Sequence, residues 1–125
     1  MISIVDDDTF ARSATENLLM SLGYEVLAFA SAEEFLASGR ADDTSCLITD
    51  VAMPGLTGLD LQQRLMEDGK RVPIIFITAF FSQDTRAQAV AGGAVCFLGK
   101  PYQETCLIKC LNTALDRSRK PYERA

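Results

Sequence analysis

The chain lacks histidine altogether, and its 125 residues carry a formal net charge of −5. Nucleic acids and anionic membranes attract concentrated positive charge, so we expect no direct binding of either one by this domain. No apolar run approaches the roughly twenty residues that a membrane-spanning helix needs. The beginning of the chain also lacks the basic region and long apolar core of a signal peptide, and we expect a cytoplasmic protein.

The four cysteines, Cys46, Cys96, Cys106 and Cys110, include no C-x-x-C pair. Zinc sites use closely spaced cysteines, often together with histidines, so this spacing and the missing histidine disfavour zinc. In a reducing compartment, cysteines are mostly small core residues. We therefore expect neither a zinc site nor a disulfide framework.

Strand-like apolar runs alternate with stretches of helical periodicity, which is typical of βαβ units and a parallel sheet. With 48% hydrophobic residues, the chain has enough apolar side chains for one domain with a buried core. Residues from 116 onward are charged and show no apolar periodicity, so 116–125 are expected to form a tail or the beginning of a linker. We expect strands at residues 2–5, 25–29, 46–49, 72–77 and 95–98, and helices at 10–22, 31–39, 61–69, 82–92 and 107–115.

Residues with phosphate or metal chemistry follow four of the expected strands. Asp6, Asp7 and Asp8 come after the first strand, of which two are expected to lie near Asp50 at the end of the third, while Thr78 and Lys100 follow the last two strands. The carboxyl ends of parallel strands share one edge of a sheet, where ligands bind in α/β proteins. We therefore expect these side chains to meet there, although they are far apart in the sequence.

The carboxylates in this set predict a cation site. Two like charges roughly 4 Å apart repel by about 4 kcal/mol at an effective dielectric constant near 20, so such a cluster retains a proton or recruits a cation. Oxygen ligands in an open site favour Mg²⁺, and Mn²⁺ should substitute. Asp50 stands alone at its strand end and is the candidate nucleophile, which would form an acyl phosphate. Lys100 and Thr78 are suited to bind phosphoryl oxygens.

Each of these residues also has a simpler structural interpretation. An aspartate after a strand is often a solvated turn residue or a helix cap, and we expect Asp8 to be such a cap. Threonine is frequent in strands, and a lysine before a proline is usually solvated. The joint occurrence of these residues at successive strand ends is what favours a phosphoryl-transfer site.

Four segments, IVDDD, LITDVAMPGLTGLDL, IIFITA and AGGAVCFLGKP, together resemble the receiver domain of two-component response regulators, in the CheY-like superfamily. The resemblance covers nearly the whole chain and implies a receiver domain over residues 1–115. It also implies a flavodoxin-like α/β fold, a three-layer (βα)5 sandwich whose parallel five-stranded sheet has the order 2-1-3-4-5.

The local sequence, especially the segments SAEEFL and DVAMPGLTGLDL, is similar to that of FixJ-type transcriptional regulators. In these proteins the receiver precedes a helix-turn-helix DNA-binding domain. Residues 116–125 would then begin the linker to such an output domain, and the phosphorylation state would control transcription.

The resemblance also implies roles for the acidic residues. Asp6 and Asp7 would be the acidic metal pair, and Asp50 would be both a metal ligand and the phosphoacceptor. Ala52 would contribute its backbone carbonyl to the Mg²⁺ site. A histidine kinase would supply the phosphoryl group in trans, which fits a chain that has no histidine of its own.

The remaining implied roles concern switching. Thr78 would be the switch hydroxyl, Lys100 would bind the phosphoryl group, and Phe97 would change its burial on phosphorylation. The surface formed by the expected fourth helix, last strand and last helix would then change, commonly for homodimerisation.

Two positions beside the expected site lack an acidic or amide side chain, and this predicts slow loss of the phosphoryl group. Ala52 and Phe80 stand two residues after Asp50 and Thr78 and should flank the path of a water that attacks the acyl phosphate. Neither side chain can orient that water. We expect a regulatory phosphoacceptor with intrinsic phosphotransfer and autodephosphorylation, rather than an enzyme.

Two alternatives remain open. A haloacid-dehalogenase-type phosphohydrolase also uses an aspartate nucleophile with Mg²⁺, but it needs a second carboxylate at the position that Ala52 occupies. A receiver-like interaction module that is not phosphorylated would be expected to lack one of the key residues.

Overall fold

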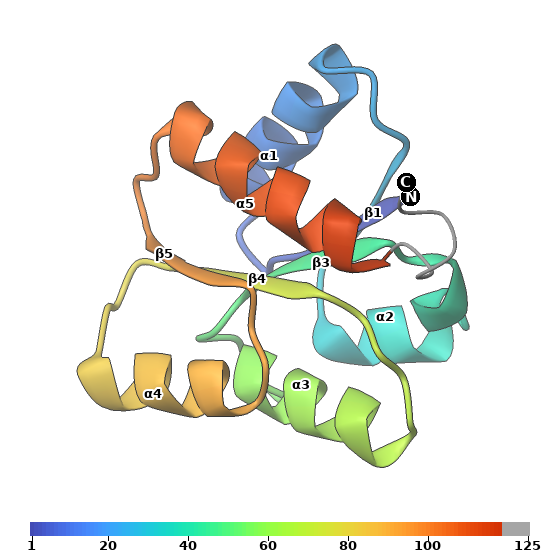
Figure 1. The fold of residues 1–125 in the computed structure, drawn as a ribbon, viewed down its shortest axis with the longest axis vertical. Helices are drawn as coiled ribbons and strands as arrows, with labels where there is room; N and C mark the ends of the chain where they lie inside the picture. Colours follow the sequence, from blue (N-terminus) through green and yellow to red (C-terminus); the bar gives the residue numbers. More distant parts are fainter. Residues whose placement is uncertain (119–125) are drawn as a thin grey trace.

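A parallel five-stranded sheet forms the middle layer of the computed structural model, which describes residues 1–118 (Figure 1). The strand order β2-β1-β3-β4-β5 confirms the expected flavodoxin-like topology, and every neighbouring pair is parallel. The strands are β1 (Ile2–Val5), β2 (Val26–Phe29), β3 (Cys46–Asp50), β4 (Ile74–Thr78) and β5 (Cys96–Gly99).

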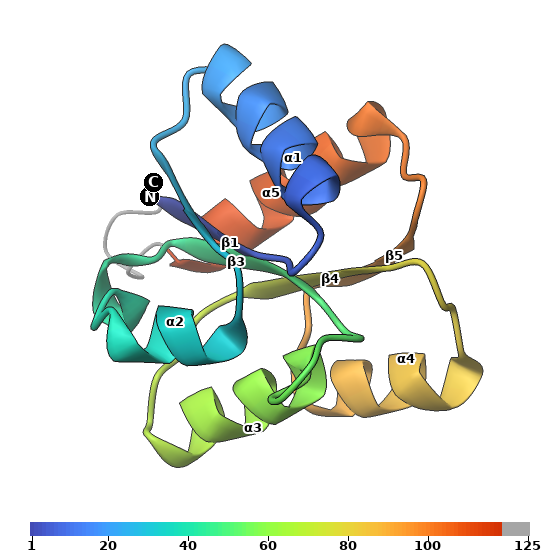
Figure 2. The same cartoon turned by 180° about the vertical axis from the view of Figure 1, so that it is seen from behind.

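Helices cover both faces of the sheet. Helices α1 (Thr9–Ser21) and α5 (Glu104–Ser118) lie on one face, as Figures 1 and 2 show from opposite sides. The other face carries α2 (Ala32–Ala37), α3 (Gly58–Glu67) and α4 (Gln83–Ala91), and a short 3-10 helix, η1 (Ala41–Asp43), precedes β3. None of the helices in residues 1–118 has the length and apolar character to cross a membrane.

The last helix is longer than the sequence predicts, because α5 runs through residues 116–118, which are expected to be part of the tail. The rest of that expected tail, 119–125, lies outside the described residues.

The three central strands are apolar runs because both of their faces are covered by helices. Every residue of β1, β3 and β4 is buried. Alternate side chains enter two separate cores: Ile48 packs on the α1 and α5 side with Leu107 and Leu111, whereas Leu47 packs on the other side with Phe35. This pleated alternation sends the apolar side chains into the layers and leaves the strand ends for polar residues.

Local hydrogen bonds fix the loops that follow β1 and β3. Asp8 caps α1, as expected, because its side chain accepts hydrogen bonds from the backbone N–H groups of Phe10 and Ala11. Gly58, at the beginning of α3, lies so close to the backbone of Asp50 that a Cβ at this position would collide with the Asp50 carbonyl oxygen. The cap thus defines the beginning of α1 after the acidic loop, and the absence of a side chain at Gly58 lets α3 begin directly against the backbone of Asp50.

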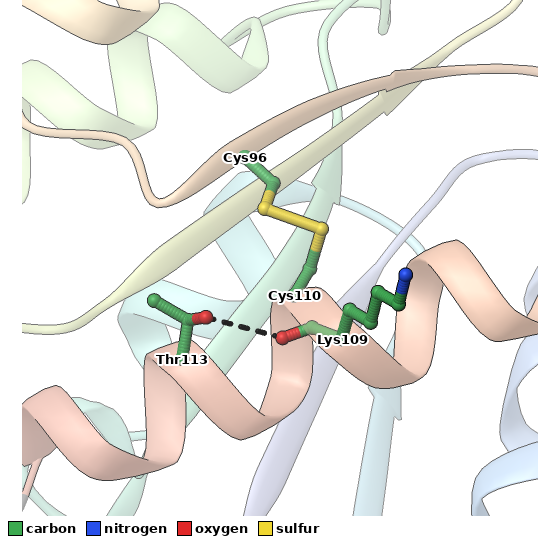
Figure 3. The surroundings of a disulfide bond; sticks show 4 residues. All are labelled: Cys96, Lys109, Cys110 and Thr113. Atoms are coloured by element: carbon green, nitrogen blue, oxygen red, sulfur yellow. Dashed lines mark hydrogen bonds between the residues drawn. A yellow bond between two sulfur atoms is a disulfide. The ribbon is translucent and has the colours of Figure 1, made fainter.

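The expectation that the cysteines would be unpaired is wrong for two of them. Cys96 on β5 and Cys110 on α5 form a disulfide, shown in Figure 3, while Cys46 and Cys106 are free. Packing of α5 on β5 brings the Cα atoms of the pair to 6.0 Å, inside the usual range for a disulfide. The sequence spacing gave no indication of this pairing, because one cysteine belongs to a strand and the other to a helix.

Candidate functional site

Lys100 joins two carboxylates from different strands at the carboxyl edge of the sheet. Its Nζ donates to Asp6 Oδ2 at 2.9 Å and to Asp50 Oδ2 at 2.8 Å. The exposed fractions of the Lys100, Asp6 and Asp50 side chains are 20%, 10% and 9%. Residues separated by 94 and 50 positions therefore form one partly buried ionic cluster.

Asp7 completes a group of three carboxylates with Asp6 and Asp50. One oxygen from each side chain lies within 4.8 Å of the others, and Asp7 is the exposed member. Counting formal charges, three carboxylates and the Lys100 ammonium leave two negative charges, which a divalent cation would balance. Oxygen donors in a partly open site suit Mg²⁺, so the residues fit the expected ion.

Backbone N–H groups orient the two carboxylates that contact Lys100. Asp50 Oδ1 accepts a hydrogen bond from the Ala52 N–H at 3.2 Å, and Asp6 Oδ1 accepts one from the Asp8 N–H at 2.9 Å. In both carboxylates, Oδ1 thus accepts the backbone bond and Oδ2 faces Lys100. The first of them also places the Ala52 backbone beside Asp50, while a ligand role for the Ala52 carbonyl stays a prediction.

Arg12 on α1 is a site neighbour that sequence reasoning missed. Its guanidinium donates to the backbone carbonyl of Asp6 at 2.7 Å and so ties α1 to the acidic loop. An arginine six residues after an aspartate has no distinctive pattern, and only the packing of α1 reveals this contact.

Thr78 lies at the same edge and is fully enclosed. It is the last residue of β4, and its carbonyl accepts a hydrogen bond from the Lys100 N–H at 2.8 Å. Its hydroxyl accepts a bond from the Phe80 N–H at 3.2 Å, within its own loop. The register pairs Asp50 with Ile77, which places Thr78 one residue beyond the phosphoacceptor candidate. Its contact with a phosphoryl oxygen stays a prediction.

Phe97 lies on the opposite side of β5 from the disulfide. Its ring packs against Phe76 at a centroid distance of 6.2 Å and against Phe81 at 5.6 Å, and it is partly buried. Phe80, in contrast, is 77% exposed beside the site. Phe97 thus packs, partly buried, against the core on the α4 side of the sheet, and its change of burial stays a prediction.

The electrostatic environment keeps Lys100 charged. Burial by itself would lower the pKa of the ammonium, but the hydrogen bonds and negative charges of Asp50 and Asp6 outweigh it and raise the pKa above its ordinary value. Lys100 is therefore protonated throughout the neutral range, as a group that binds phosphoryl oxygens must be.

A cavity of about 330 Å³ lies between α1 and the sheet, next to the ionic cluster. Asp6, Asp50 and Lys100 line its polar end. The hydroxyls of Thr15 on α1 and Tyr102 in the loop after β5 share a hydrogen bond of 2.9 Å at its border. This bond links α1 to the loop that carries Lys100, and sequence reasoning did not anticipate it.

A family model and the curated relatives both match this chain to response regulators. The response regulator receiver domain model matches residues 2–112. Nodulation protein W of Bradyrhizobium diazoefficiens is 43% identical over 123 residues, which cover 98% of this chain and 54% of that protein. The transcriptional regulatory protein FixJ of Azorhizobium caulinodans is 34% identical over 117 residues, 94% of this chain and 56% of that protein.

Solved structures agree with these matches. The crystal structure of FixJ-N has a TM-score of 0.83 and 32% identity, with 92% of each chain covered. The chain spans about half the length of the curated relatives that it matches, 54% and 56% for the two named above.

Proposed function

This chain belongs to the response regulator receiver domain family of two-component systems, and we propose that Asp50 accepts a phosphoryl group from a histidine kinase in an Mg²⁺-dependent reaction. The observation that carries this proposal is the contact of Lys100 with both Asp50 and Asp6, next to a third carboxylate, that of Asp7. This cluster combines a nucleophile, a set of hard oxygen ligands and a fixed positive charge.

The chemistry follows from these groups. Mg²⁺, held by Asp6, Asp7, Asp50 and the Ala52 carbonyl, would neutralise charge on the phosphoryl donor. A carboxylate oxygen of Asp50 attacks the phosphorus, the phosphorus–nitrogen bond to the kinase histidine breaks, and an acyl phosphate forms.

After transfer, Lys100 and Thr78 hold the phosphoryl group. The Lys100 ammonium, freed from Asp50, donates to a phosphoryl oxygen, and the Thr78 hydroxyl donates to another. The short distance between Lys100 and Asp50 supports this exchange of partners, because the ammonium already lies where the phosphoryl oxygens would develop.

The relatives suggest the output. We propose that phosphorylation moves Phe97 and changes the α4-β5-α5 surface to favour a homodimer, which controls transcription through a helix-turn-helix domain. Residues 1–115 would be the receiver and 116–125, of which the first three extend α5, the beginning of a linker. The receiver itself would bind neither nucleic acid nor membrane, and the protein would act in the cytoplasm.

Labelling with acetyl phosphate and Mg²⁺ tests the function against its two rivals. Stable labelling that is abolished by Asp50→Asn, detected by intact mass, supports the receiver. Continuous release of phosphate would instead indicate a phosphohydrolase, and the absence of both would indicate an interaction module. Repeating the reaction with EDTA, and then with Mn²⁺, tests the metal requirement.

The residues near Asp50 predict a long-lived phosphoryl group. Ala52 and Phe80 are both exposed beside the site, and neither can orient an attacking water. The double variant Ala52→Asn with Phe80→Gln should lose phosphate roughly tenfold faster than the natural protein, because it can position that water. The measurement is phosphate loss after rapid labelling. A half-life of seconds in the natural protein, or no acceleration in the variant, would contradict the idea.

A further inference from the structure

The disulfide joins the edge strand of the sheet to the middle of the last helix. Cys96 begins β5, and Cys110 lies 14 residues later on α5, with Lys109 and Thr113 beside it on the helix in Figure 3. On the same strand, Phe97 faces the opposite layer and Lys100 follows four residues after Cys96. The bond therefore ties α5 to the segment that carries the switch aromatic and the site lysine.

Apolar side chains also pack α5 against the sheet, beside this bond. Leu107, Leu111 and Ala114 are fully buried against the sheet and hold the helix in place. Disulfides in a reducing compartment, where the proposed function places this protein, are usually transient and redox-sensing rather than structural. The sulfur pair is thus better explained as a reversible element than as a permanent one.

The four cysteines differ in access to solvent. Cys96 is partly exposed, whereas Cys110 is buried, with 7% of its area exposed, so a small reagent can approach the pair from the side of Cys96. Cys46 is fully buried, and burial raises the pKa of its thiol to about 12, which leaves it unreactive. Cys106 is exposed but free, one helical turn before Cys110.

We propose that Cys96 and Cys110 form a redox modification site, oxidised by low-molecular-weight disulfides and reduced by dithiols, whose closed form restricts movement of α5 against β5. The consequence for signalling rests on the proposed function, in which a change of the α4-β5-α5 surface transmits phosphorylation. The oxidised receiver should accept phosphate but dimerise less well than the reduced one.

The oxidation proceeds by two exchanges. The Cys96 thiolate attacks one sulfur of the external disulfide, a mixed disulfide forms, and the first external thiolate leaves. The Cys110 thiolate then attacks the Cys96 sulfur, the protein disulfide forms, and the second external thiolate leaves. The two protein thiols lose two electrons and two protons, and the external disulfide gains them as two thiols.

The first experiment tests the site alone. The full chain is reduced with dithiothreitol, freed of it, and incubated with glutathione disulfide before intact-mass and peptide analysis. We expect a Cys96–Cys110 crosslink that dithiothreitol reverses, forms equally in Cys106→Ser, and is absent in Cys110→Ala. A product that stays a mixed disulfide, or a crosslink through Cys106, would overturn the proposal.

Thermal unfolding provides a second measure of the same crosslink. Closing a loop of 14 residues should raise the melting temperature of the oxidised natural protein by roughly 10 °C over its reduced form. The reduced natural protein is the folding control for Cys110→Ala, which should show no response to glutathione disulfide. Equal melting temperatures in the two redox forms of the natural protein would contradict a crosslink that constrains the chain.

The second experiment tests the consequence. Oxidised and reduced samples are labelled with acetyl phosphate and Mg²⁺, and Asp50 labelling and dimerisation are measured together, by mass and by analytical ultracentrifugation. We expect equal labelling and a dimer dissociation constant at least roughly fivefold larger in the oxidised form. Equal labelling with equal dimerisation would overturn the regulatory consequence.

Amide hydrogen exchange separates this proposal from the proposed function. If neither sample is labelled, the proposed function fails, but exchange in β5 and α5 of the unlabelled protein still decides whether the bond restrains them. Exchange at least roughly tenfold slower in the oxidised form supports the restraint, and equal rates overturn it.

Discussion

Two ion pairs of nearly equal length lie at opposite ends of the sheet. Lys100 contacts Asp50 at 2.8 Å at the carboxyl edge, and Lys70 contacts Asp42 at 2.7 Å near the amino edge. The exposed fractions are 20% and 9% for the first pair but 36% and 72% for the second. Water therefore screens the Lys70 pair much more effectively than the Lys100 pair.

Because the two distances are nearly equal, the difference in burial should decide how much each ion pair contributes to stability. Exposed pairs contribute little to stability, because water solvates each partner nearly as well when the pair is broken. A charge left alone in a buried position costs several kcal/mol, so its partner is either retained or replaced by another cation. The carboxylates that contact Lys100 are thus suited to exchange the lysine for another cation. The Lys70 pair is a solvated surface contact.

Lys100→Met should have the largest effect on stability. The substitution keeps much of the side-chain length but leaves the Asp6 and Asp50 carboxylates without their ammonium. We expect the free energy of unfolding without Mg²⁺ to fall by about 3 kcal/mol, measured by urea denaturation with circular dichroism at neutral pH. Adding Mg²⁺ should recover part of this loss, because the cation supplies the missing positive charge. A loss below about 0.5 kcal/mol would place this pair with the surface pairs.

Removal of Mg²⁺ should have the next largest effect. At a concentration ten times the dissociation constant, a ligand that binds only the folded state stabilises it by about 1.4 kcal/mol, and EDTA should remove that amount. Asp7→Asn should abolish most of the Mg²⁺ effect with little change in the metal-free stability, because Asp7 is the exposed carboxylate of the cluster. Calorimetry with and without Mg²⁺ measures both. An undiminished Mg²⁺ effect in this variant would exclude Asp7 as a ligand.

The position of the site at the carboxyl edge of the sheet could be predicted from the sequence, because it depends on where the apolar runs end. The strands that carry Asp50 and Thr78 end where apolar residues give way to polar ones, and parallel pairing places those ends together. The first residue of each strand is harder to predict. The fourth strand begins at Ile74 instead of 72, since Pro73 has no N–H to donate to a neighbouring strand.

Contacts made by packing of helices on the sheet could not be predicted. The hydrogen bond between Thr15 and Tyr102 joins residues 87 positions apart, and the disulfide joins a strand to a helix. Both depend on the exact placement of α1 and α5, which periodicity does not specify. The last helix also begins at Glu104 rather than 107, because its first turn is exposed and adds nothing to the apolar pattern.

Tyr102→Phe should have a moderate effect. It removes the hydroxyl that bonds to Thr15 at 2.9 Å, at the border of the cavity beside Lys100. We expect a loss of about 1 kcal/mol in the free energy of unfolding, the usual net value of one hydrogen bond. Thr15→Val is the matched control, and the double variant should lose less than the sum of the two single losses, since both remove the same bond. Strictly additive losses would show that the two hydroxyls act separately.

Lys70→Met should have the smallest effect and tests the comparison most directly. The substitution is the same as at Lys100, and the broken contact is as short, but both partners remain accessible to water. We expect the free energy of unfolding to change by less than about 0.5 kcal/mol, and high salt should reduce even this difference. The same urea denaturation measures it, with Lys100→Met run in parallel. Equal losses in the two variants would mean that contact distance, and not burial, sets the strength of these ion pairs. Burial of the Lys100 cluster would then be no reason to expect that its carboxylates exchange the lysine for a metal ion, or that the lysine exchanges them for a phosphoryl group.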